Sequence, residues 1–435
     1  MKTDFARELA IKILYKIEEN NGYSNLILDE HLQKERQKLN EKDIGLISEI
    51  VYGTITWKLT IDTILQKYSN IKINKISKWI KIILQIGIYQ IVFLDKIPKS
   101  AAVNESVNLC KKYGYKSVGF VNAILRKVNK SDYEEFENIK DNNERISKMY
   151  SMPEWIVKKL IKQYGISKTE EICINSNLKP TITIRVNSLK NTIEQLKQKL
   201  DERNILWENA QTPNFLHLKN IKNVSNIDLF KEGFFTVQDE GAGKIALILN
   251  PKQEEIILDA CSAPGGKTTH LAELIENKGK ILAWDIHEHR VNLVKESAKR
   301  LGISIIEANV KDSSKYDAKY ENKFDKILLD VPCMGLGVCK RKPDIKWQKT
   351  EKEIKEITKI QENILQICSK YLKKGGELVY STCSILKEEN EDIIERFLEI
   401  EKSGTKEGFE LICKTIILPN SQTDGFFICK IRKSI

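Results

Sequence analysis

The chain has 435 residues, which is enough for two or three domains and a sizeable core. Its formal net charge is +11, and its nine cysteines have neither a disulfide framework nor zinc-site spacing, so we predict reduced thiols, no metal and a cytoplasmic location. No apolar run approaches the roughly 18 residues of a membrane span, and the charged amino terminus lacks a signal-peptide apolar region, so no membrane association is expected.

Residues 1–140 are predicted to be all-helical. Apolar residues recur at helical spacing over residues 5–18, and residues 43–57, 76–94 and 119–128 favour further buried helices. Ser100, shortly after Pro98, is predicted to cap another helix. This stretch has no catalytic constellation, so by itself it indicates a helical binding or packing module.

The positive charge lies in the first part of the chain. Residues 1–235 carry 38 Lys and Arg against 28 Asp and Glu, whereas residues 236–435 carry 33 against 32. Such an excess favours a nucleic-acid partner, because neutralising phosphates supplies much of the affinity. The alternative is that lysine is the default surface residue of a chain rich in Lys, Ile and Asn.

Residues 141–235 have a mixed pattern. A helix is predicted to begin at Pro153, and it is followed by a strand over 181–186, a helix over 192–203 and a strand over 215–218. This alternation predicts a small α/β subdomain, similar to an RNA-recognition motif, that leads into the last segment.

Residues 236–435 alternate strands and helices. Strands are predicted over 255–259, 280–285, 304–308, 324–330 and 377–381, with helices over 268–276, 289–301 and 351–372. That order predicts a mostly parallel, doubly wound sheet of the Rossmann type. A last apolar run, 426–431, is predicted to be an antiparallel edge strand.

A glycine-rich loop follows the first of these strands and opens a helix, in the run Asp259-Ala-Cys-Ser-Ala-Pro-Gly-Gly-Lys267. Glycines let the backbone approach a ligand, and a helix start offers free N–H groups. One interpretation is a phosphate-binding P-loop with Asp330 as magnesium partner, but Cys261 stands where that motif requires its first glycine. The other interpretation is a nucleoside-binding loop.

The second strand favours the nucleoside, because it ends in Asp285. An acid at this place accepts hydrogen bonds from the hydroxyls of a bound ribose in Rossmann-type sites, and a P-loop enzyme does not need it.

Two cysteines, Cys333 and Cys383, each follow an apolar strand. If both strands are parallel in one sheet, both thiols emerge at its carboxyl edge, where such sheets bind ligands. They could instead be two buried structural cysteines.

The loop, the ribose acid and the two thiols together point to S-adenosylmethionine and a cytosine. A thiolate that adds to carbon 6 of cytosine lets carbon 5 accept a methyl group, after which a base removes the carbon-5 proton and the thiolate leaves.

These motifs resemble the RNA cytosine-C5 methyltransferases of the Nop2/Sun family. The resemblance rests on the glycine loop, Asp285 and several further runs, namely Val237-Gln-Asp239, Asp330-Val-Pro-Cys333 with Gly335 and Gly337, Arg341-Lys-Pro-Asp-Ile-Lys-Trp347, Ser381-Thr-Cys-Ser384 and Asp424-Gly-Phe-Phe427. The first segment resembles NusB-type RNA-binding domains through Ile86-Gly-Ile-Tyr-Gln90, Ala101-Ala-Val-Asn-Glu105 and Gly119-Phe-Val-Asn-Ala-Ile-Leu-Arg126. The pairing implies three domains, a NusB-like domain over 1–140, a subdomain over 141–235 and a methyltransferase domain over 236–435.

The resemblance implies a role for each site residue. Cys383 would attack carbon 6, Cys333 would help release the methylated base, and Asp330 would hydrogen-bond the base. The cofactor would be held by Asp285 at the ribose, by Asn309 near the adenine and by the loop residues Cys261, Ser262, Ala263, Pro264, Gly265, Gly266 and Lys267, with Asp330 adjacent. The family usually has an acid where Asn309 stands, so Asp312 is the alternative. Related DNA enzymes attack with the Pro-Cys thiol, so the assignment of Cys383 and not Cys333 as the attacking thiol rests on the resemblance.

The implied substrate is 16S rRNA, naked, as a precursor or in an early small-subunit particle, with the cytosine conventionally numbered 967 as target. A monomer is expected. A P-loop NTPase and a non-catalytic RNA-binding factor are the alternative functions. Trp347 could stack on a base or pack under its loop, and Arg185 and Asn187 could touch RNA or brace a domain junction. Of the remaining cysteines, Cys339 is expected to have no role, and Cys110, Cys173, Cys368, Cys413 and Cys429 are expected in the core.

Overall fold

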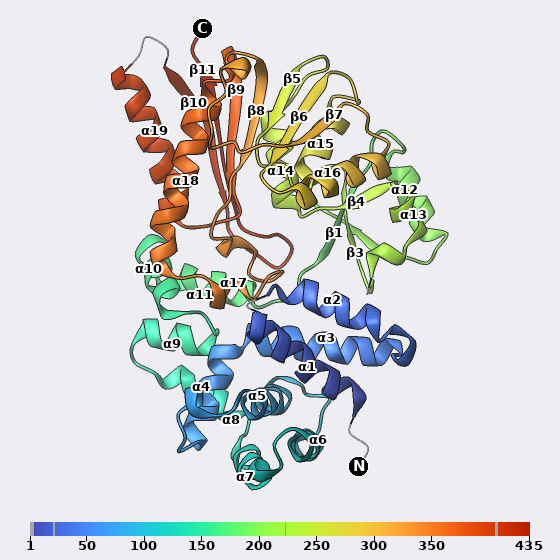
Figure 1. Ribbon diagram of the computed structural model, residues 1–435, viewed down its shortest axis with the longest axis vertical. Helices are drawn as coiled ribbons and strands as arrows, with labels where there is room; N and C mark the ends of the chain where they lie inside the picture. Colours follow the sequence, from blue (N-terminus) through green and yellow to red (C-terminus); the bar gives the residue numbers. More distant parts are fainter. Residues whose placement is uncertain (1–3, 21, 222, 405–407) are drawn as a thin grey trace. The chain divides into compact units, whose positions relative to one another are not determined.

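The computed structural model describes residues 4–20, 22–221, 223–404 and 408–435. The chain divides into two units (Figure 1). The helical unit comprises Met1–Leu178 and Cys339–Glu351, and the sheet unit comprises Lys179–Val338 and Lys352–Ile435. The chain therefore leaves the sheet unit after Val338 and returns to it at Lys352. No helix in the described part of the chain is long and apolar enough to cross a membrane.

The helical unit contains no strand in the residues that the structure describes. Its α-helices are α1 (Phe5–Asn20), α2 (Ser24–Lys34), α3 (Glu41–Thr56), α4 (Lys58–Tyr68), α5 (Lys78–Phe93), α6 (Lys99–Tyr113), α7 (Val118–Lys127), α8 (Ser131–Glu134), α9 (Asn142–Met149), α10 (Glu154–Tyr164), α11 (Ile166–Ser176) and α17 (Ile345–Gln348).

Helix α5 is the centre of this unit. It is buried nearly all round, and it packs against α1, α3, α4, α6 and α7. A helix that is apolar on every side is stable only when other elements surround it. Gly87 allows the close approach, since a Cβ there would lie 2.7 Å from Leu125 Cδ1 and 2.9 Å from Ser106 Oγ.

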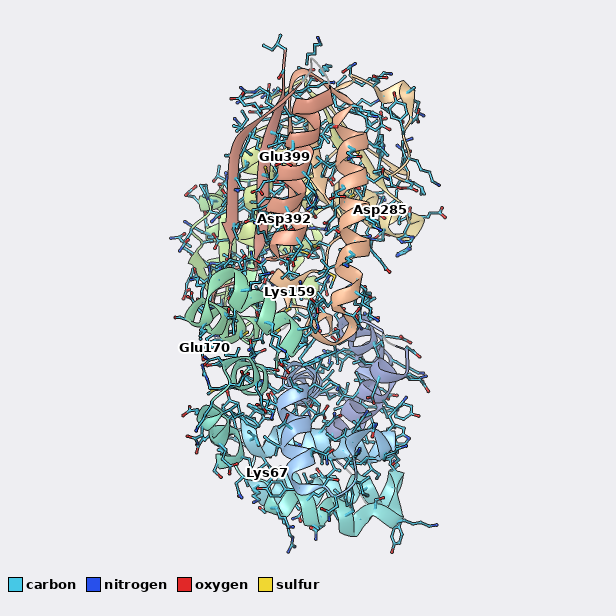
Figure 2. The ribbon with its side chains drawn as sticks, turned by 90° about the vertical axis from the view of Figure 1, so that its left-hand side faces the viewer. Lys67, Lys159, Glu170, Asp285, Asp392 and Glu399 are labelled. Carbon is cyan, nitrogen blue, oxygen red and sulfur yellow. The ribbon has the colours of Figure 1, made fainter. Side chains whose placement is uncertain are left out.

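At the unit's surface, Lys67 of α4 (Figure 2) places its Nζ 2.7 Å from Asp132 Oδ1 and 2.6 Å from Glu135 Oε2.

The helices predicted over 5–18, 43–57, 76–94 and 119–128 are confirmed to within a few residues. The predicted cap at Ser100 is wrong. Helix α6 begins at Lys99, so Ser100 lies inside its first turn, and the N-cap position belongs to Pro98. The ring of Pro98 holds its φ at −59°, and its carbonyl accepts hydrogen bonds from the N–H groups of Ala101 and Ala102.

The segment 339–351 is anchored in the helical unit. Lys346 is buried, and its Nζ donates to Thr56 O at 2.7 Å, Ser151 O at 3.0 Å and Asn177 Oδ1 at 3.0 Å. The indole N–H of Trp347 donates to Ile55 O at 2.7 Å, and the ring packs on the helical core. Packing is therefore the correct alternative for Trp347.

The sheet unit begins with a small antiparallel sheet in the order β2-β3-β1-β4. Its elements are β1 (Ile182–Val186), α12 (Ile193–Asp201), β2 (Trp207–Asn209), β3 (Phe215–Leu218), α13 (Asp228–Lys231) and β4 (Phe235–Val237). Thr192 and Gln195 form a capping box at the start of α12. The predicted strands and helix are confirmed, whereas β2 and β4, of three residues each, were not predicted.

Within the described residues, the second sheet has seven strands in the order β10-β11-β9-β8-β5-β6-β7. The strands are β5 (Ile256–Asp259), β6 (Lys280–Asp285), β7 (Ile306–Val310), β8 (Phe324–Asp330), β9 (Leu372–Thr382), β10 (Phe409–Ile417) and β11 (Phe426–Lys433). Strands β5 to β9 pair in parallel, and β11 pairs antiparallel with both β9 and β10. The predicted mostly parallel sheet is confirmed.

Helices cover both faces of this sheet (Figure 1). One face packs against α14 (Glu240–Leu249), α15 (Gly266–Leu274) and α16 (Glu288–Leu301), and the other against α18 (Glu351–Ser369) and α19 (Glu391–Gly404). The sheet is therefore doubly wound, as predicted.

The predicted edge position of residues 426–431 is wrong, because β10 lies outside β11. The side chains from Phe426 to Ile431 are all buried, which suits a strand covered on both faces. In β10, by contrast, residues 410–415 are exposed, and they include the apolar Leu411 and Ile412. Apolar and polar residues do not alternate strictly along this strand, so the period-2 pattern does not predict it.

We predict that Lys346→Met destabilises the helical unit. The substitution leaves two carbonyl oxygens and one amide oxygen without their ammonium donor, and a buried acceptor left unpaired costs about 1–3 kcal/mol. Burial lowers the pKa of Lys346 to about 8, so at pH 7 the side chain is charged and these bonds are intact. The measurement is guanidinium unfolding followed by circular dichroism, with the exposed Lys342→Met in the same segment as control. An unchanged transition in Lys346→Met would show that water replaces the ammonium.

Candidate active site

The predicted site residues lie where parallel strands end. Strand β5 ends at Asp259, β6 at Asp285, β8 at Asp330 and β9 at Thr382. Because β6, β5, β8 and β9 are neighbours and parallel, these four ends share one edge of the sheet. Ligands of open α/β sheets bind at this edge.

The structure brings the two thiols together. Cys333 Sγ lies 3.2 Å from Cys383 Sγ, and both side chains are partly exposed. The contact with Cys383 and burial raise the pKa of Cys333 well above its ordinary value. Cys333 is therefore protonated at neutral pH and can donate a hydrogen bond to the other sulfur.

Asp330, at the end of the strand β8 that precedes Cys333, connects this strand to the glycine loop through its side chain. Its Oδ1 accepts a hydrogen bond from Ser381 Oγ at 2.9 Å, and its Oδ2 lies 2.7 Å from Lys267 Nζ. Burial by itself would lower the pKa of Lys267, but the charge of Asp330 outweighs it and raises that pKa. Lys267 is thus a stable cation at the carboxyl edge.

The glycine loop has little freedom. Gly265 has a φ of +103°, and a Cβ there would approach Val294 Cα to 3.2 Å. Ser262 N donates to Trp284 O at 2.8 Å, and Thr268 Oγ1 donates to Asp259 Oδ2 at 2.7 Å. Burial raises the pKa of Asp259 to about 7. A side chain at Gly265 would displace α16, so this turn requires glycine.

Asp285 and the loop fit a nucleoside cofactor. Asp285 is 5% exposed at the end of β6, where Oδ1 accepts from His287 N at 3.1 Å and Oδ2 lies 3.4 Å from Arg290 Nη1. Beside Gly266, the buried Gln238 Nε2 has no hydrogen-bond partner among the described residues. A buried, unpaired donor next to a glycine loop indicates a ligand acceptor at this place.

Asn309 lies in β7, the strand beside β6, and Asp312 lies two residues after the end of β7. In the β6–β7 pair, Trp284 is opposite Asn309 and Asp285 is opposite Val310, and Asn309 is exposed. The carboxylate of Asp312 is instead occupied by a turn, because its Oδ1 accepts from Ser314 N at 3.0 Å and from Ser314 Oγ at 2.5 Å. Opposite residues in a sheet share a face, so Asn309 lies on the face of Trp284 and not on that of Asp285.

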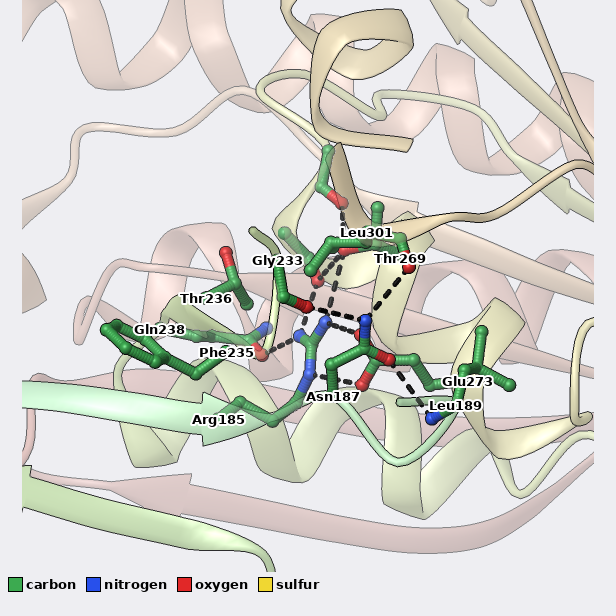
Figure 3. A network of polar contacts seen from close by, with 12 residues as sticks. Arg185, Asn187, Leu189, Gly233, Phe235, Thr236, Gln238, Thr269, Glu273 and Leu301 are labelled. Atoms are coloured by element: carbon green, nitrogen blue, oxygen red, sulfur yellow. Dashed lines mark hydrogen bonds and ion pairs between the residues drawn. The ribbon is translucent and has the colours of Figure 1, made fainter. Parts of the chain in front are cut away.

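Arg185 braces the glycine loop from the small sheet (Figure 3). It lies on β1, is 1% exposed, and donates to Glu273 Oε2 at 2.9 Å and Oε1 at 2.8 Å. Its Nη1 donates to Gly266 O at 2.9 Å and to Gln238 Oε1. The first turn of α15 is therefore tied to β1 by one guanidinium, and the bracing alternative for Arg185 is correct.

Asn187 braces the same junction. Its Nδ2 donates to Gly233 O at 2.8 Å and to Leu301 O at 2.9 Å, and it is buried (Figure 3).

Among the other cysteines, Cys110, Cys173, Cys368 and Cys429 are buried as predicted, and Cys339 is buried too. The prediction for Cys413 is wrong, because Cys413 lies exposed on the outer strand β10. Within the described ranges, no three His, Cys, Asp or Glu side chains cluster in a way that could hold a metal ion.

Sequence reasoning missed two contributors. The sequence indicates Gln238 only as part of the Val237-Gln-Asp239 motif, and it gives no signal for Glu389. Glu389 stands in a polar run, 387–392, in which every residue but Asn390 is charged; such a run is typical of a solvated surface, yet Glu389 is fully buried.

Three family models match the chain in order. The NusB family matches residues 5–130, a ferredoxin-like domain of RsmF/B-like methyltransferases matches residues 152–225, and the 16S rRNA methyltransferase RsmB/F matches residues 246–432. The three predicted fold classes are confirmed.

Whole proteins match over their full length. The probable ribosomal RNA small subunit methyltransferase B of Bacillus subtilis is 37% identical over 449 residues, which cover 100% of both chains. The ribosomal RNA small subunit methyltransferase B of Escherichia coli O7:K1 is 32% identical over 430 residues, which cover 96% of each. Among solved structures, that of PH0851 is 27% identical with a TM-score of 0.82 and covers 99% of both chains. A methyltransferase homolog from Pyrococcus horikoshii is 26% identical with a TM-score of 0.59 and covers 68% of this chain and 100% of its own.

We predict that Arg185→Lys weakens cofactor binding and stability together. Lysine keeps the positive charge but cannot span both Glu273 oxygens and Gly266 O, and each buried acceptor left unpaired costs about 1–3 kcal/mol. The matched control is Arg203→Lys, because Arg203 also forms a bidentate pair, with Asp228, but on the surface. Surface pairs are worth about 0–1 kcal/mol. Thermal unfolding and S-adenosylmethionine calorimetry are the measurements, and equal effects of the two substitutions would contradict a bracing role.

Proposed function

The chain belongs to the family of ribosomal RNA small subunit methyltransferases B, and from that premise we propose that it methylates carbon 5 of a cytosine in 16S rRNA with S-adenosylmethionine as methyl donor. The observation that carries the proposal is the pair of thiols, 3.2 Å apart, at the ends of neighbouring strands β8 and β9. The family is one of methyltransferases, so the P-loop NTPase and the non-catalytic RNA-binding factor are set aside.

In the proposed reaction, Cys383 adds as a thiolate to carbon 6 of the cytosine, and the new S–C bond makes carbon 5 nucleophilic. When bound, S-adenosylmethionine supplies the electrophilic methyl group. A base then removes the proton of carbon 5, and the S–C6 bond breaks to restore the aromatic ring and the thiolate. Cys333, protonated beside Cys383, assists this release by hydrogen bonding to the departing sulfur.

Asp330 is proposed to orient the base. One of its oxygens is bound by Ser381 and the other by Lys267, so the carboxylate is fixed in place before a substrate arrives. A carboxylate held in this way can accept a hydrogen bond from the 4-amino group of the cytosine, or from N3–H once the adduct is protonated at N3, without reorganising. Preorganisation of this kind lowers the barrier because no part of the site has to move during the reaction.

The cofactor is proposed to lie along the glycine loop from Cys261 to Lys267, with Asp285 on the ribose hydroxyls and Asn309 near the adenine. The fixed Gly265 turn, the buried Asp285 carboxylate and the Nε2 of Gln238, which has no partner among the described residues, support this placement.

The helical unit is proposed to supply RNA affinity. Residues 1–178 and 339–351 carry 34 Lys and Arg against 24 Asp and Glu, which is nearly the whole excess charge of the chain. The proposal has further parts. The target is the cytosine conventionally numbered 967, and the rRNA is naked, a precursor or part of an early small-subunit particle. The chain divides into three domains at residues 140 and 235, and the protein is a cytoplasmic monomer. Mapping 5-methylcytosine in 16S rRNA from a deletion strain, with and without this gene restored, tests the reaction and the target together.

We predict that Asp285→Ala weakens S-adenosylmethionine binding without added metal. Loss of one charged acceptor from two ribose hydroxyls should cost about 1.5–3 kcal/mol, or roughly 10- to 150-fold in Kd. Calorimetry measures the affinity, and Glu307→Ala, at an exposed carboxylate on the neighbouring strand β7, is the control. An unchanged Kd in Asp285→Ala would remove Asp285 from the site.

We predict opposite fates for the two thiol variants. Cys383→Ala cannot form the bond to carbon 6 and should give neither methyl transfer nor a covalent RNA adduct. Cys333→Ala should attack and methylate, then stall as a covalent protein–RNA species. A denaturant-resistant, slowly migrating band that disappears on RNase treatment measures the adduct. A band with Cys383→Ala and none with Cys333→Ala would reverse the roles, and full turnover by both variants would return the pair to a structural role.

A further inference from the structure

We propose that Glu389 is a positioning residue that holds the Cys333 loop and the Cys383 loop against each other, so that the two sulfurs face one another before RNA binds. The inference rests on the proposed function in treating the two thiols as the reacting pair. Glu389 is fully buried at the end of the short 3-10 helix η8 (Lys387–Glu389), so it cannot touch a substrate.

One carboxylate reaches the residue after each cysteine. Glu389 Oε2 accepts a hydrogen bond from the backbone N–H of Met334 at 2.8 Å. Glu389 Oε1 accepts one from the hydroxyl of Ser384. Met334 follows Cys333 and Ser384 follows Cys383, so the two loops are joined through a single side chain.

The residues before the cysteines are tied to the same cluster. Gln361 Nε2 donates to Pro332 O at 2.9 Å and to Glu389 Oε2 at 3.0 Å. Thr382 Oγ1 donates to the side chain of the next residue after Glu389, Asn390 Oδ1, at 2.6 Å. Each cysteine is therefore held on both sides by hydrogen bonds that lead to Glu389 or its neighbour.

The chemistry of the cluster indicates a functional role. The groups that donate to Glu389 are a backbone N–H, an amide and a hydroxyl, all neutral, and a buried carboxylate without a cation is expensive. Burial raises the pKa of Glu389, although its hydrogen bonds oppose that shift. Strained or costly groups of this kind persist where they serve a site.

Glu389 also affects the nearby thiol. After the contact with Cys383 and burial, its negative charge is a further cause of the raised pKa of Cys333. The same carboxylate thus fixes the geometry of the pair and helps keep Cys333 protonated, which is the state needed for hydrogen bonding to the other sulfur.

The test uses the full chain with Glu389→Gln, Ser384→Ala and, as control, Glu395→Gln at an exposed position of α19. The glutamine preserves shape but removes the charge and turns one acceptor into a donor facing Met334 N–H or Ser384. Ser384→Ala removes the hydrogen bond to Glu389 and a longer one, of 3.4 Å, from Leu386 N. It tests the positioning role if Glu389→Gln fails to fold. We expect kcat for rRNA methylation to fall about 10- to 100-fold in Glu389→Gln, since small misplacements of reacting groups have effects of this order. The fall in Ser384→Ala should be smaller, and KM for S-adenosylmethionine should stay within about twofold of wild type in both.

A second readout does not depend on methylation. Diamide removes two electrons and two protons from a thiol pair and so links Cys333 to Cys383 at a rate that depends on the thiolate fraction and on how the sulfurs face each other. Loss of the Glu389 charge would raise the thiolate fraction of Cys333 and speed the linkage, so a slower linkage reports the geometry. Mass spectrometry of the linked peptide should show slower linkage in Glu389→Gln than in Glu395→Gln. Slower linkage in a protein that never methylates rRNA would uphold the positioning role and overturn the proposed function. Unchanged linkage and unchanged kcat in both site variants would overturn the positioning role.

Discussion

The register between β8 and β9 is the constraint on which the active site depends. Asp330 pairs with Ser381 across these parallel strands, and Cys333 and Cys383 follow three and two residues later. The hydrogen bond from Ser381 to Asp330 therefore belongs to the same row as the last rungs of the sheet. A slip of one residue would turn every side chain of one strand to the opposite face, and it would separate both the carboxylate from its partners and the two sulfurs from each other.

Buried polar groups complete what the sheet register begins. The Arg185–Glu273 pair fixes the start of α15, and the Glu389 cluster fixes the two thiol loops. Neither arrangement is justified by stability, because apolar residues of the same volume pack as well or better than a buried charge. Both arrangements instead set the orientation of the segments that they join, since hydrogen bonds specify an orientation that apolar contacts leave open. The loops around the site have few regular backbone bonds of their own, so their side-chain bonds must supply that orientation.

Much of this architecture is predictable from local sequence, and the remainder depends on long-range partners. Apolar runs such as 324–330 identify parallel strands because both of their faces are buried. The apolar residues of β10 do not alternate strictly with polar ones, and without β10 the sequence places β11 at the edge. The sequence predicts the site residues that follow strands, because the carboxyl ends of parallel strands lie at the same edge of the sheet. The Arg185–Glu273 pair joins residues that are 88 positions apart, so neighbours in the sequence do not indicate it. Glu389 is buried although the residues around it in the sequence are mostly charged, so its role cannot be inferred locally either.

The path of the chain connects the sheet unit, where we propose methyl transfer, to the helical unit, where we propose RNA binding. Five residues after Cys333, the chain passes from the sheet unit into the helical unit at Val338, and it returns at Lys352. Inside the helical unit the excursion is held by the buried ammonium of Lys346 and by the indole of Trp347. The segment that carries Cys333, one of the two proposed reacting thiols, is therefore continuous with a segment held inside the helical unit. Within the sheet unit, Glu389 and Gln361 remove conformational freedom from the Cys333 loop. A loop restrained in this way loses less entropy when its thiol takes up the geometry that the proposed reaction needs.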